Sequence, residues 1–388
     1  MSLLELTNVT RRYRRGQSPA VDGITLAVSR GEILALVGPS GSGKTTLLRL
    51  IAGFEAPDAG TVAIAGRAVA SPGINVPPEA RGVGIVFQDY ALFPHLTVEG
   101  NVAFGLHALA AVERRQRVRD LLALVGLPMF AYRYPHELSG GQQQLVALAR
   151  ALAPAPAVLL LDEPFSNLDA DLRGQMREQV QRILKATGTT VVFVTHGQDE
   201  AFAIADRVGV LHRGRLEQLD TPETIYHRPA TPFVAEFVGD ATFIPGVVDD
   251  TGIVTDVGTF PADRVGPAGT TLEVMIRPDD VTFVPSPDGD ALIVQRDFRG
   301  TETVYCLELP GGRRLYSSQA SWATEAVGDR VRVAVHLEHV VTFPRRTAGL
   351  DMAPRVGSGH SGPADAVQAG GVSARSSGDR SDRGATRP

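Results

Sequence analysis

A glycine-rich segment with one lysine is the clearest chemical feature of this 388-residue sequence. Residues Gly38–Thr45 read Gly-Pro-Ser-Gly-Ser-Gly-Lys-Thr, between an apolar run, Ile33–Val37, and a helix-like run, Thr45–Ala52. Glycines let the backbone curl so that its N–H groups point inward, and the following helix adds its positive N-terminal end. Strand, loop and helix in this order predict a phosphate-binding loop. The alternative is a glycine-rich turn that contains a lysine by chance.

Individual side chains of this segment suit a nucleoside triphosphate and its metal ion. Lys44 can reach the β- and γ-phosphates, and Thr45 offers a hydroxyl to Mg²⁺. Ser40 is a lesser phosphate-contact candidate. The candidate nucleotide-binding residues of the segment are Gly38, Ser40, Gly41, Gly43, Lys44, Thr45 and Thr46. We therefore expect ATP and Mg²⁺ as the bound species.

Two carboxylates end another apolar run. Val158–Leu161 is followed by Asp162 and Glu163. Ligands bind at the carboxyl ends of strands in open α/β sheets, so Asp162 is the candidate Mg²⁺ ligand. Glu163 can face an attacking water and polarise it as a general base. An ordinary Asp-Glu-Pro turn is the alternative, which the phosphate-binding loop upstream disfavours.

His196 directly follows a third apolar run, Thr190–Thr195. If this run lies parallel to the one that ends in Asp162, the histidine reaches the same edge of the sheet. There it would hydrogen-bond the γ-phosphate and hold the water and Glu163 in place. A lone histidine at a strand end is otherwise a structural residue, and the neighbouring chemistry favours the catalytic role.

The elements that must position these residues alternate along the first 240 positions. Short apolar runs alternate with helical stretches, which predicts a largely parallel sheet covered by helices. The runs are Ile33–Val37, Gly84–Phe87, Val158–Leu161, Val191–Thr195 and Arg207–Leu211. From about residue 88 to residue 150 we expect a helical insertion without strands, with helices around Val98–Leu109 and Ala111–Leu124.

The pattern of residue types changes after this α/β region. From residue 241 to residue 346, short β-branched runs punctuated by Gly and Pro predict a small all-β barrel or sandwich. The runs are Gly246–Val248, Thr271–Ile276, Ala291–Gln295, Thr303–Leu309 and Arg330–Leu337. Residues 347–388 have few large apolar side chains, so we expect a disordered tail whose deletion leaves ATPase activity intact.

Composition is that of an ordinary globular protein, with 43% hydrophobic residues, 21% charged residues and a net charge of -5. The sequence has no excess of basic residues, so its charge does not indicate nucleic acid as a partner. The single cysteine, Cys306, excludes an internal disulfide and a multi-cysteine metal site. We see no signal peptide, and runs such as Ala157–Leu161 are far shorter than the roughly 20 residues that cross a bilayer. Any membrane role must therefore come through a partner.

A further motif, Leu138–Gln144, reads Leu-Ser-Gly-Gly-Gln-Gln-Gln and precedes a helical run through Arg150. By itself, Ser139 is a helix N-cap at a positive helix end. Its position between the phosphate-binding loop and the acidic strand end makes the segment resemble the signature motif of ABC ATPases. The resemblance covers nearly all of residues 1–345, with Gln88 as the Q-loop, Ser166–Asp169 as the D-loop, His196 as the switch histidine and Tyr13 as the adenine-stacking aromatic. For Tyr13 the alternative is a strand-edge aromatic that fills the core.

The resemblance implies the fold of an α/β P-loop NTPase with a helical subdomain, working as a homodimer. Each ATP would lie between the phosphate-binding loop of one copy and the signature motif of the other. Ser139, Gly141 and Gln142 would then serve the partner's nucleotide, and Asp169 would also contact nucleotide. Gln88 would sense the γ-phosphate and join Thr45 and Asp162 at Mg²⁺. The helical insertion would dock a transmembrane permease, which places the chain at the cytoplasmic face of the cell membrane.

The C-terminal region resembles the transport-associated OB-type domain, called TOBE, of importer ATPases. Segments that resemble the ferric iron branch are Arg81–His95, Ile276–Asp280, Arg296–Gly300 and Thr303–Leu309. We therefore expect ferric iron as the solute, delivered by an extracytoplasmic binding protein. The alternative solutes are a polyamine, sulfate, thiamine or a sugar. A different function, an ATP-dependent ligand-sensing switch, also stays open, although Glu163 supplies a base that a pure switch does not need. For Arg277 and Asp279, a structural turn with an ion pair is at least as well supported as a role in binding a ligand.

Two positions depart from the family pattern. Leu145 stands where arginine is usual after the glutamines, which predicts the loss of a surface ion pair or a helix-capping contact. Asn167 stands in the D-loop where alanine is common. Neither is expected to touch the phosphates or the metal ion.

Overall fold

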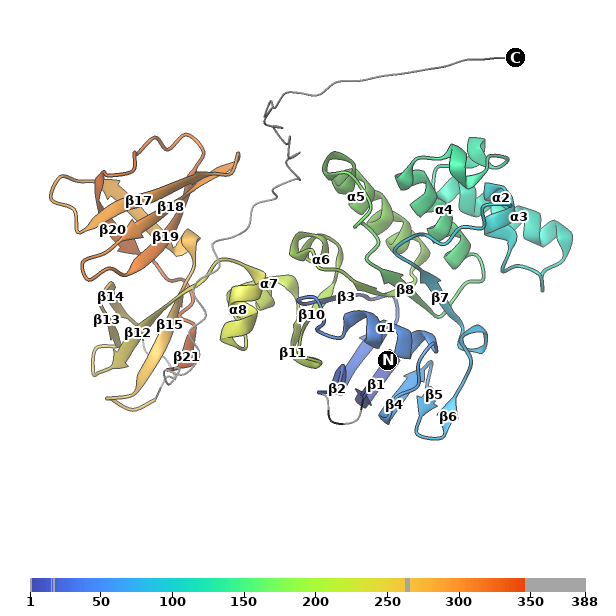
Figure 1. Ribbon diagram of the computed structural model, residues 1–388, viewed down its shortest axis with the longest axis horizontal. Helices are drawn as coiled ribbons and strands as arrows, with labels where there is room; N and C mark the ends of the chain where they lie inside the picture. The colour runs from blue at the N-terminus through green and yellow to red at the C-terminus, as the bar shows by residue number, and fades with distance from the viewer. Residues whose placement is uncertain (1, 15, 17, 262–265, 346–388) are drawn as a thin grey trace, which may run out of the picture. The chain divides into compact units, whose positions relative to one another are not determined.

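The computed structural model describes residues 2–14, 16, 18–261 and 266–345 (Figure 1). A six-stranded sheet has the order β11-β10-β3-β9-β8-β7, in which all neighbours except the edge pair β10–β11 are parallel. Its strands are β3 (Ile33–Val37), β7 (Val83–Val86), β8 (Val158–Asp162), β9 (Thr190–Val194), β10 (Arg207–His212) and β11 (Arg215–Asp220). The predicted parallel strands are thus confirmed. Every residue of β3 and β9 is buried, as expected for strands covered on both faces.

A second sheet, which the sequence analysis missed, is antiparallel and has the order β2-β1-β4-β5-β6. Its strands are β1 (Ser2–Arg11), β2 (Val21–Ser29), β4 (Ala59–Ile64), β5 (Arg67–Ser71) and β6 (Ile74–Asn75). Leu4 and Leu6 of β1 are buried on the face that packs with Leu47 of helix α1 (Lys44–Ala52) in one core. The same core includes Leu36 of β3, so α1 packs with both sheets.

The insertion at residues 88–150, all of which are described, is helical and holds no strand, as predicted. It contains α2 (Val98–Ala103), α3 (Ala111–Leu124) and α4 (Gly140–Leu152), with 3-10 turns at Pro128–Phe130 and Pro135–Glu137. Helix α2 ends earlier than expected because Gly105, a poor helix former, follows it closely. Further helices are α5 (Ala170–Thr187), α6 (Gln198–Ile204), α7 (Pro222–His227) and α8 (Pro232–Val238), and a 3-10 turn lies at Pro78–Ala80.

The C-terminal part is all-β, as predicted, and consists of two antiparallel five-stranded sheets, β14-β13-β12-β15-β21 and β16-β20-β17-β18-β19. Its strands are β12 (Thr242–Val248), β13 (Ile253–Thr255), β14 (Gly258–Phe260), β15 (Thr271–Ile276), β16 (Val281–Pro285), β17 (Ala291–Phe298), β18 (Glu302–Glu308), β19 (Arg314–Ala320), β20 (Arg330–Val335) and β21 (Thr342–Pro344). Ile244, Val274 and Tyr305 belong to one core that both sheets share. The predicted tail, 347–388, lies outside the described residues. In the ranges that the structure describes, no helix is long and apolar enough to span a membrane.

Arg277 has a structural role in this part of the chain. Its guanidinium lies 3.9 Å from the centroid of the Tyr226 ring and donates to the carbonyls of Tyr226, at 2.8 Å, and Asp240, at 3.2 Å. The carboxylate of Asp280 accepts the backbone N–H of Arg277 at 2.7 Å. The structural turn is therefore supported, whereas among the described residues no ion pair joins Arg277 to Asp279, and Asp280 contacts the backbone of Arg277 instead.

Candidate functional site

Three neighbouring parallel strands bring the predicted catalytic residues to one edge of the six-stranded sheet. Strand β9 lies between β3 and β8, and its Val194 is in register with both Leu36 and Asp162. The backbone N–H of Glu163 donates to the carbonyl of Val194 at 3.0 Å. The loop after β3, the carboxylates after β8 and His196 after β9 therefore meet where open α/β sheets bind ligands.

A cavity of about 640 Å³ lies at this edge. Its volume is within the range of roughly 300–1,000 Å³ that is typical of small-molecule sites. It is lined by Tyr13, Ala20, Ser40, Gly41, Ser42, Gly43, Lys44, Thr45, Thr46, Glu163 and His196. All of these except Ala20 and Ser42 are predicted site residues. The predicted core-filling alternative for Tyr13 is wrong, since this residue is 54% exposed and borders the cavity.

The loop between β3 and α1 requires glycine at two positions. A Cβ on Gly38, which has a φ of 154°, would lie 2.2 Å from the carbonyl oxygen of Leu211. A Cβ on Gly43, at a φ of 103°, would lie 2.2 Å from the carbonyl oxygen of Ala20. The hydroxyl of Ser42 is buried and has no hydrogen-bond partner among the described residues. This tightly curled backbone with an unpaired hydroxyl fits a phosphate cradle.

Lys44 places a cation inside the loop. Its side-chain Nζ donates to the carbonyl oxygens of Gly38 at 2.7 Å and Pro39 at 3.1 Å, and the residue is only 7% exposed. Burial lowers the pKa of Lys44, and the nearby carboxylates of Glu163 and Asp162 act in the opposite direction. An ammonium with so little hydration suits an anionic partner such as a phosphate.

Asp162 and Thr45 provide oxygen donors next to the cradle. Burial, followed by the charge of Glu163, raises the pKa of Asp162, whereas a hydrogen bond with the Thr45 side chain lowers it. In nucleotide sites Mg²⁺ is held by one or two carboxylates together with phosphate oxygens. Among the described residues, no group of three or more His, Cys, Asp or Glu side chains forms a metal site. The carboxylate and hydroxyl present here fit a Mg²⁺ ion that arrives with a triphosphate.

Glu163 and His196 form a pair at the mouth of the cavity. The Glu163 Oε2 atom lies 3.4 Å from His196 Nδ1, and the side chains are 24% and 65% exposed. Glu163 has a φ of 45°, a left-handed conformation that costs an ordinary residue about 1–2 kcal/mol. Strain of this kind is common at functional positions. The two neighbouring carboxyls have different partners, the Thr45 side chain for Asp162 and His196 for Glu163, so that one can serve a metal ion and the other a water.

Several predicted residues do not line the cavity within one chain. Ser139 is the N-cap of α4, as predicted: its hydroxyl accepts the N–H of Gln142 at 3.4 Å, and the Gln142 side chain accepts the N–H of Ser139 at 3.0 Å. A Cβ on Gly141 would lie 3.1 Å from the sulfur of Met176, so this glycine also permits close helix packing. Asp169 precedes α5 as its N-cap residue. Gly38, Gln88 and Asp162 likewise lie outside the lining set.

The loop that contains Gln88 is held by two residues to which sequence reasoning assigned no such contact. The Asn167 amide donates to the carbonyl of Gln88 at 2.7 Å. The Arg150 guanidinium donates to the carbonyls of Tyr90 at 2.9 Å and Ala91 at 2.6 Å. Because the partners in these two contacts lie 79 and 60 residues apart in the sequence, no local sequence pattern could have predicted them.

The predicted effect of Leu145 is wrong. This residue is 4% exposed and belongs to the core of the helical insertion and the parallel sheet. Its position on the inner face of α4 suits an apolar side chain, so no surface ion pair is lost there.

Comparison with protein-family models matches two parts of the chain. Residues 21–166 match the family described as ABC transporter, and residues 274–343 match the TOBE domain. The first match spans the glycine-rich loop and the acidic strand end, and the second lies in the all-β part.

Curated relatives cover most of the chain. It is 44% identical over 332 residues to the spermidine/putrescine import ATP-binding protein PotA of Marinobacter nauticus, covering 82% of this chain and 87% of that protein. It is 46% identical over 334 residues to the sulfate/thiosulfate import ATP-binding protein CysA of Xanthomonas campestris, covering 84% of this chain and 95% of that protein. These relatives give no support to the predicted ferric iron branch, whereas polyamine and sulfate were among the alternatives left open.

Solved structures extend the similarity to the fold. The ATP-binding cassette MJ0796, in a dimeric post-hydrolysis state bound to ADP and Pi, is 34% identical with a TM-score of 0.50, covering 57% of this chain and 99% of that chain. The cbiO1 protein of Clostridium perfringens, part of the ABC transporter complex cbiONQ, is 28% identical with a TM-score of 0.54, covering 59% and 92%.

Proposed function

The chain belongs to the ABC transporter family as an ATP-binding subunit of the importer type with a TOBE domain, and we propose that it drives uptake of a polyamine or of sulfate. Its cofactors are ATP and Mg²⁺, and subunits of this family dimerise and work with membrane permease subunits. The observation that carries the proposal is the convergence of Lys44, Glu163 and His196 on one cavity beside Asp162.

The chemistry proposed for this cavity is hydrolysis of the terminal phosphate of ATP. The backbone of the loop from Gly38 and the ammonium of Lys44 bind the β- and γ-phosphates. Thr45 and Asp162 would hold Mg²⁺, which neutralises phosphate charge when bound. Glu163 takes a proton from the attacking water, and His196 orients that carboxylate and the γ-phosphate. Positioning and charge stabilisation account for most of the catalysis, as in other phosphoryl transfers.

The residues outside the cavity are proposed to act across a homodimer. Ser139, Gly141, Gln142 and Asp169 would complete the nucleotide site of the partner copy, and Gln88 would sense the γ-phosphate. The dimeric state of the similar ADP- and Pi-bound cassette supports this assignment. ATP would close the dimer and hydrolysis would reopen it, a shift driven by the different affinity of the two states for nucleotide.

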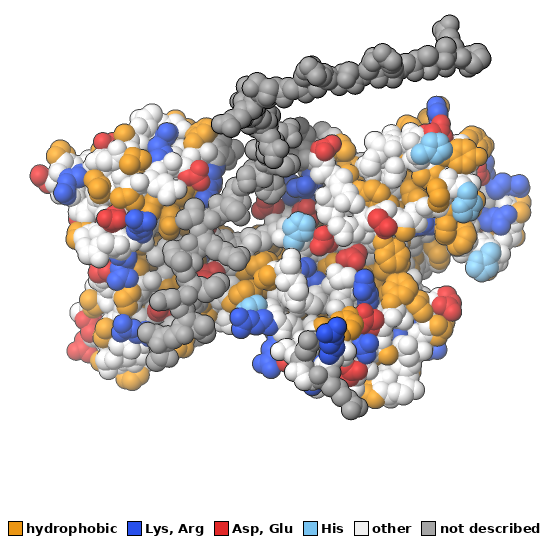
Figure 2. All heavy atoms as spheres, in the orientation of Figure 1, with side chains coloured by type: hydrophobic (Ala, Val, Ile, Leu, Met, Phe, Trp, Pro, Cys, Tyr) orange, Lys and Arg blue, Asp and Glu red, His pale blue; other side chains and the backbone are white. Residues whose placement is uncertain are grey.

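The helical insertion offers a surface for a permease at the cytoplasmic face of the cell membrane. Phe104, Met129 and Tyr132 are 58%, 89% and 82% exposed there. Figure 2 shows apolar side chains at the surface over the region of α2–α4. An exposed apolar surface of this kind is typical of protein–protein contact sites.

Hydrolysis of MgATP by the purified full chain tests the site. Glu163→Gln should lower kcat by about 10²–10⁴-fold, the usual contribution of a general base, while ATP still produces a dimer that light scattering detects. Lys44→Ala should impair nucleotide binding or turnover. Glu79→Gln and Lys185→Ala are matched controls, since Glu79 is exposed in a surface turn and Lys185 is the only other lysine of the chain. A wild-type rate in either site variant would refute the assignment.

Uptake measurements test the solute. Cells that lack this chain should lose uptake of labelled spermidine or of labelled sulfate, and recover it when the wild-type chain, but not Glu163→Gln, is supplied. Normal uptake of both solutes, with loss of ferric iron uptake, would overturn the proposed solute class and leave the ATPase assignment in place.

A further inference from the structure

Tyr13 is tethered through its hydroxyl although much of its ring is exposed. It follows β1 by two residues and borders the nucleotide cavity. The hydroxyl donates to Oε1 of Glu55 at 2.6 Å and lies 3.2 Å from the hydroxyl of Thr46. The first distance is in the range of about 2.5–2.7 Å that is usual for a hydroxyl donating to a carboxylate. A free aromatic side chain would sample several rotamers, whereas this one has a fixed partner.

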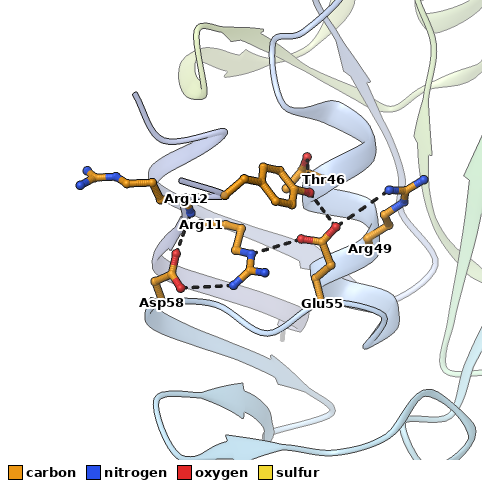
Figure 3. A network of polar contacts seen from close by, with 7 residues as sticks. Arg11, Arg12, Thr46, Arg49, Glu55 and Asp58 are labelled. Carbon is orange, nitrogen blue, oxygen red and sulfur yellow. Dashed lines mark hydrogen bonds and ion pairs between the residues drawn. The ribbon is translucent and has the colours of Figure 1, made fainter. Parts of the chain in front are cut away.

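Glu55 is itself held in place by two arginines (Figure 3). Its Oε2 atom lies 3.2 Å from Nε of Arg11, and its Oε1 atom lies 3.9 Å from a guanidinium nitrogen of Arg49. The Glu55 side chain is only 13% exposed. The carboxylate that receives the Tyr13 hydroxyl is therefore a largely buried, charge-paired anchor rather than a mobile surface group.

Asp58 fixes the end of β1 from the other side of Arg11. Its carboxylate lies 3.2 Å from a guanidinium nitrogen of Arg11 and accepts the backbone N–H of Arg12 at 2.6 Å. The guanidinium carbon of Arg11 is 5.4 Å from the centroid of the Tyr13 ring, within reach of a cation–π interaction. Figure 3 shows the side chains of Arg11, Glu55 and Asp58 pointing toward one another. The backbone before Tyr13 and the partner of its hydroxyl thus belong to one network.

We propose that Glu55 is a positioning residue for nucleotide binding, which holds Tyr13 ready to stack on the base of ATP. This inference rests on the proposed function. Thr46 belongs to α1, the helix that begins at Lys44, and Glu55 follows the end of that helix closely. The tether therefore keeps the base-stacking ring at a set separation from the phosphate cradle. A ring that is already in place loses less conformational entropy when ATP binds, and this raises affinity.

The protonation state of Tyr13 is compatible with this role. Burial, followed by the hydrogen bond with Glu55, raises the pKa of the Tyr13 hydroxyl. The hydroxyl therefore stays protonated at neutral pH and can act as the donor. The competing explanation is that Glu55 only pairs with Arg11 and Arg49 and has no influence on the nucleotide.

A double-mutant cycle on the full chain separates the two explanations. Tyr13→Phe keeps the ring and removes the hydroxyl, and Glu55→Gln keeps the shape and removes the charge. We expect Tyr13→Phe to raise the KM for MgATP by about three- to tenfold, the value of one net hydrogen bond. Glu55→Gln should raise the KM by less, because its amide oxygen still accepts the hydroxyl but without the charge. In both variants kcat should stay within about twofold of the wild type. In the Tyr13→Phe background, Glu55→Gln should raise the KM no further, because no hydroxyl is left for the side chain at residue 55 to hold.

Two controls complete the experiment. Glu79→Gln, an exposed carboxylate outside the network, should change neither parameter. Calorimetric binding of MgATP gives the same comparison without turnover. An unchanged KM and Kd in Tyr13→Phe would overturn the inference, as would an equal effect of Glu55→Gln in both backgrounds. Either result would leave the proposed function intact, whereas a wild-type chain that neither binds nor hydrolyses MgATP would refute the proposed function itself.

Discussion

Replacing Arg150 by alanine should release the loop that contains Gln88 and lower ATPase activity at a small cost in stability. Tyr90 and Ala91 of this loop have φ values of 61° and 44°, in the left-handed region that non-glycine residues avoid. The Arg150 guanidinium donates to the carbonyls of both residues, at 2.9 and 2.6 Å. The contact therefore opposes a local backbone strain.

The two opposing energies are of similar size. Each left-handed residue costs about 1–2 kcal/mol, so the pair stores about 2–4 kcal/mol. Each hydrogen bond from a charged group contributes about 1.5–3 kcal/mol, so the contact supplies about 3–6 kcal/mol. In Arg150→Ala the loop can relax and recover its strain, which leaves a net loss of only about 1–2 kcal/mol.

Activity should respond more strongly because the relaxed loop moves Gln88. A displacement of about 1 Å in a positioning element can cost about 100-fold in rate, so we expect kcat/KM for MgATP to fall by about 10–100-fold. Thermal unfolding should shift by only a few degrees, about 2–6 °C. The kcat/KM of Arg150→Lys should lie between the values of the wild type and of Arg150→Ala, since a single ammonium does not reproduce the fork that reaches both carbonyls.

Arg117→Ala is the matched control. Arg117 also donates to two carbonyls, those of Leu152 at 3.1 Å and Ala153 at 3.2 Å, at the opposite end of α4 from the signature motif. Its removal should cost at least as much stability, because Leu152 and Ala153 have no left-handed φ to relax, and should leave ATPase activity unchanged. The reasoning fails if Arg150→Ala keeps the wild-type kcat/KM, or if Arg117→Ala and Arg150→Ala lose activity equally.

Three further substitutions test other contacts of the structure. Burial raises the pKa of Asp162, so in the nucleotide-free protein this carboxyl contributes stability while it is protonated, and that contribution is lost as pH rises through the folded-state pKa. Asp162→Asn should remove this contribution from a pH series of melting temperatures and abolish Mg²⁺-dependent ATPase activity. An unchanged series would contradict the assignment. Asn167→Ala removes the bond to the Gln88 carbonyl and should lower kcat by about two- to tenfold with little change in the KM for MgATP. A selective rise in KM in steady-state kinetics would contradict this role of Asn167. Arg277→Ala removes two hydrogen bonds and the stacking on Tyr226, and should lower the free energy of unfolding by about 2–4 kcal/mol in denaturant titrations while the ATPase rate at low temperature is kept; a loss below about 0.5 kcal/mol would show that the contact is not structural.

Most residues that line the cavity were predictable from the sequence because the main parts of the site are short and contiguous. The glycines of Gly38–Thr45 define one backbone shape, and the apolar run before Asp162 defines one buried strand with carboxylates at its end. Both patterns depend on conformational limits of a few neighbouring residues, which the sequence states directly. The N-cap at Ser139 is local in the same sense. The parallel strands, the helical insertion and the all-β region followed from periodicity alone.

Only the tertiary structure decided which distant side chains hold these parts in place. Tyr13 and Glu55 are 42 residues apart, and Arg150 and Tyr90 are 60 residues apart. A single carboxylate or guanidinium has many possible partners and no periodicity, so its partner is set by how the apolar cores bring the elements together. The antiparallel sheet of β1, which the sequence analysis missed, is what brings the end of β1 and Tyr13 to α1. The sequence therefore determined which groups are proposed to perform the chemistry, and packing between distant elements determined how each is positioned.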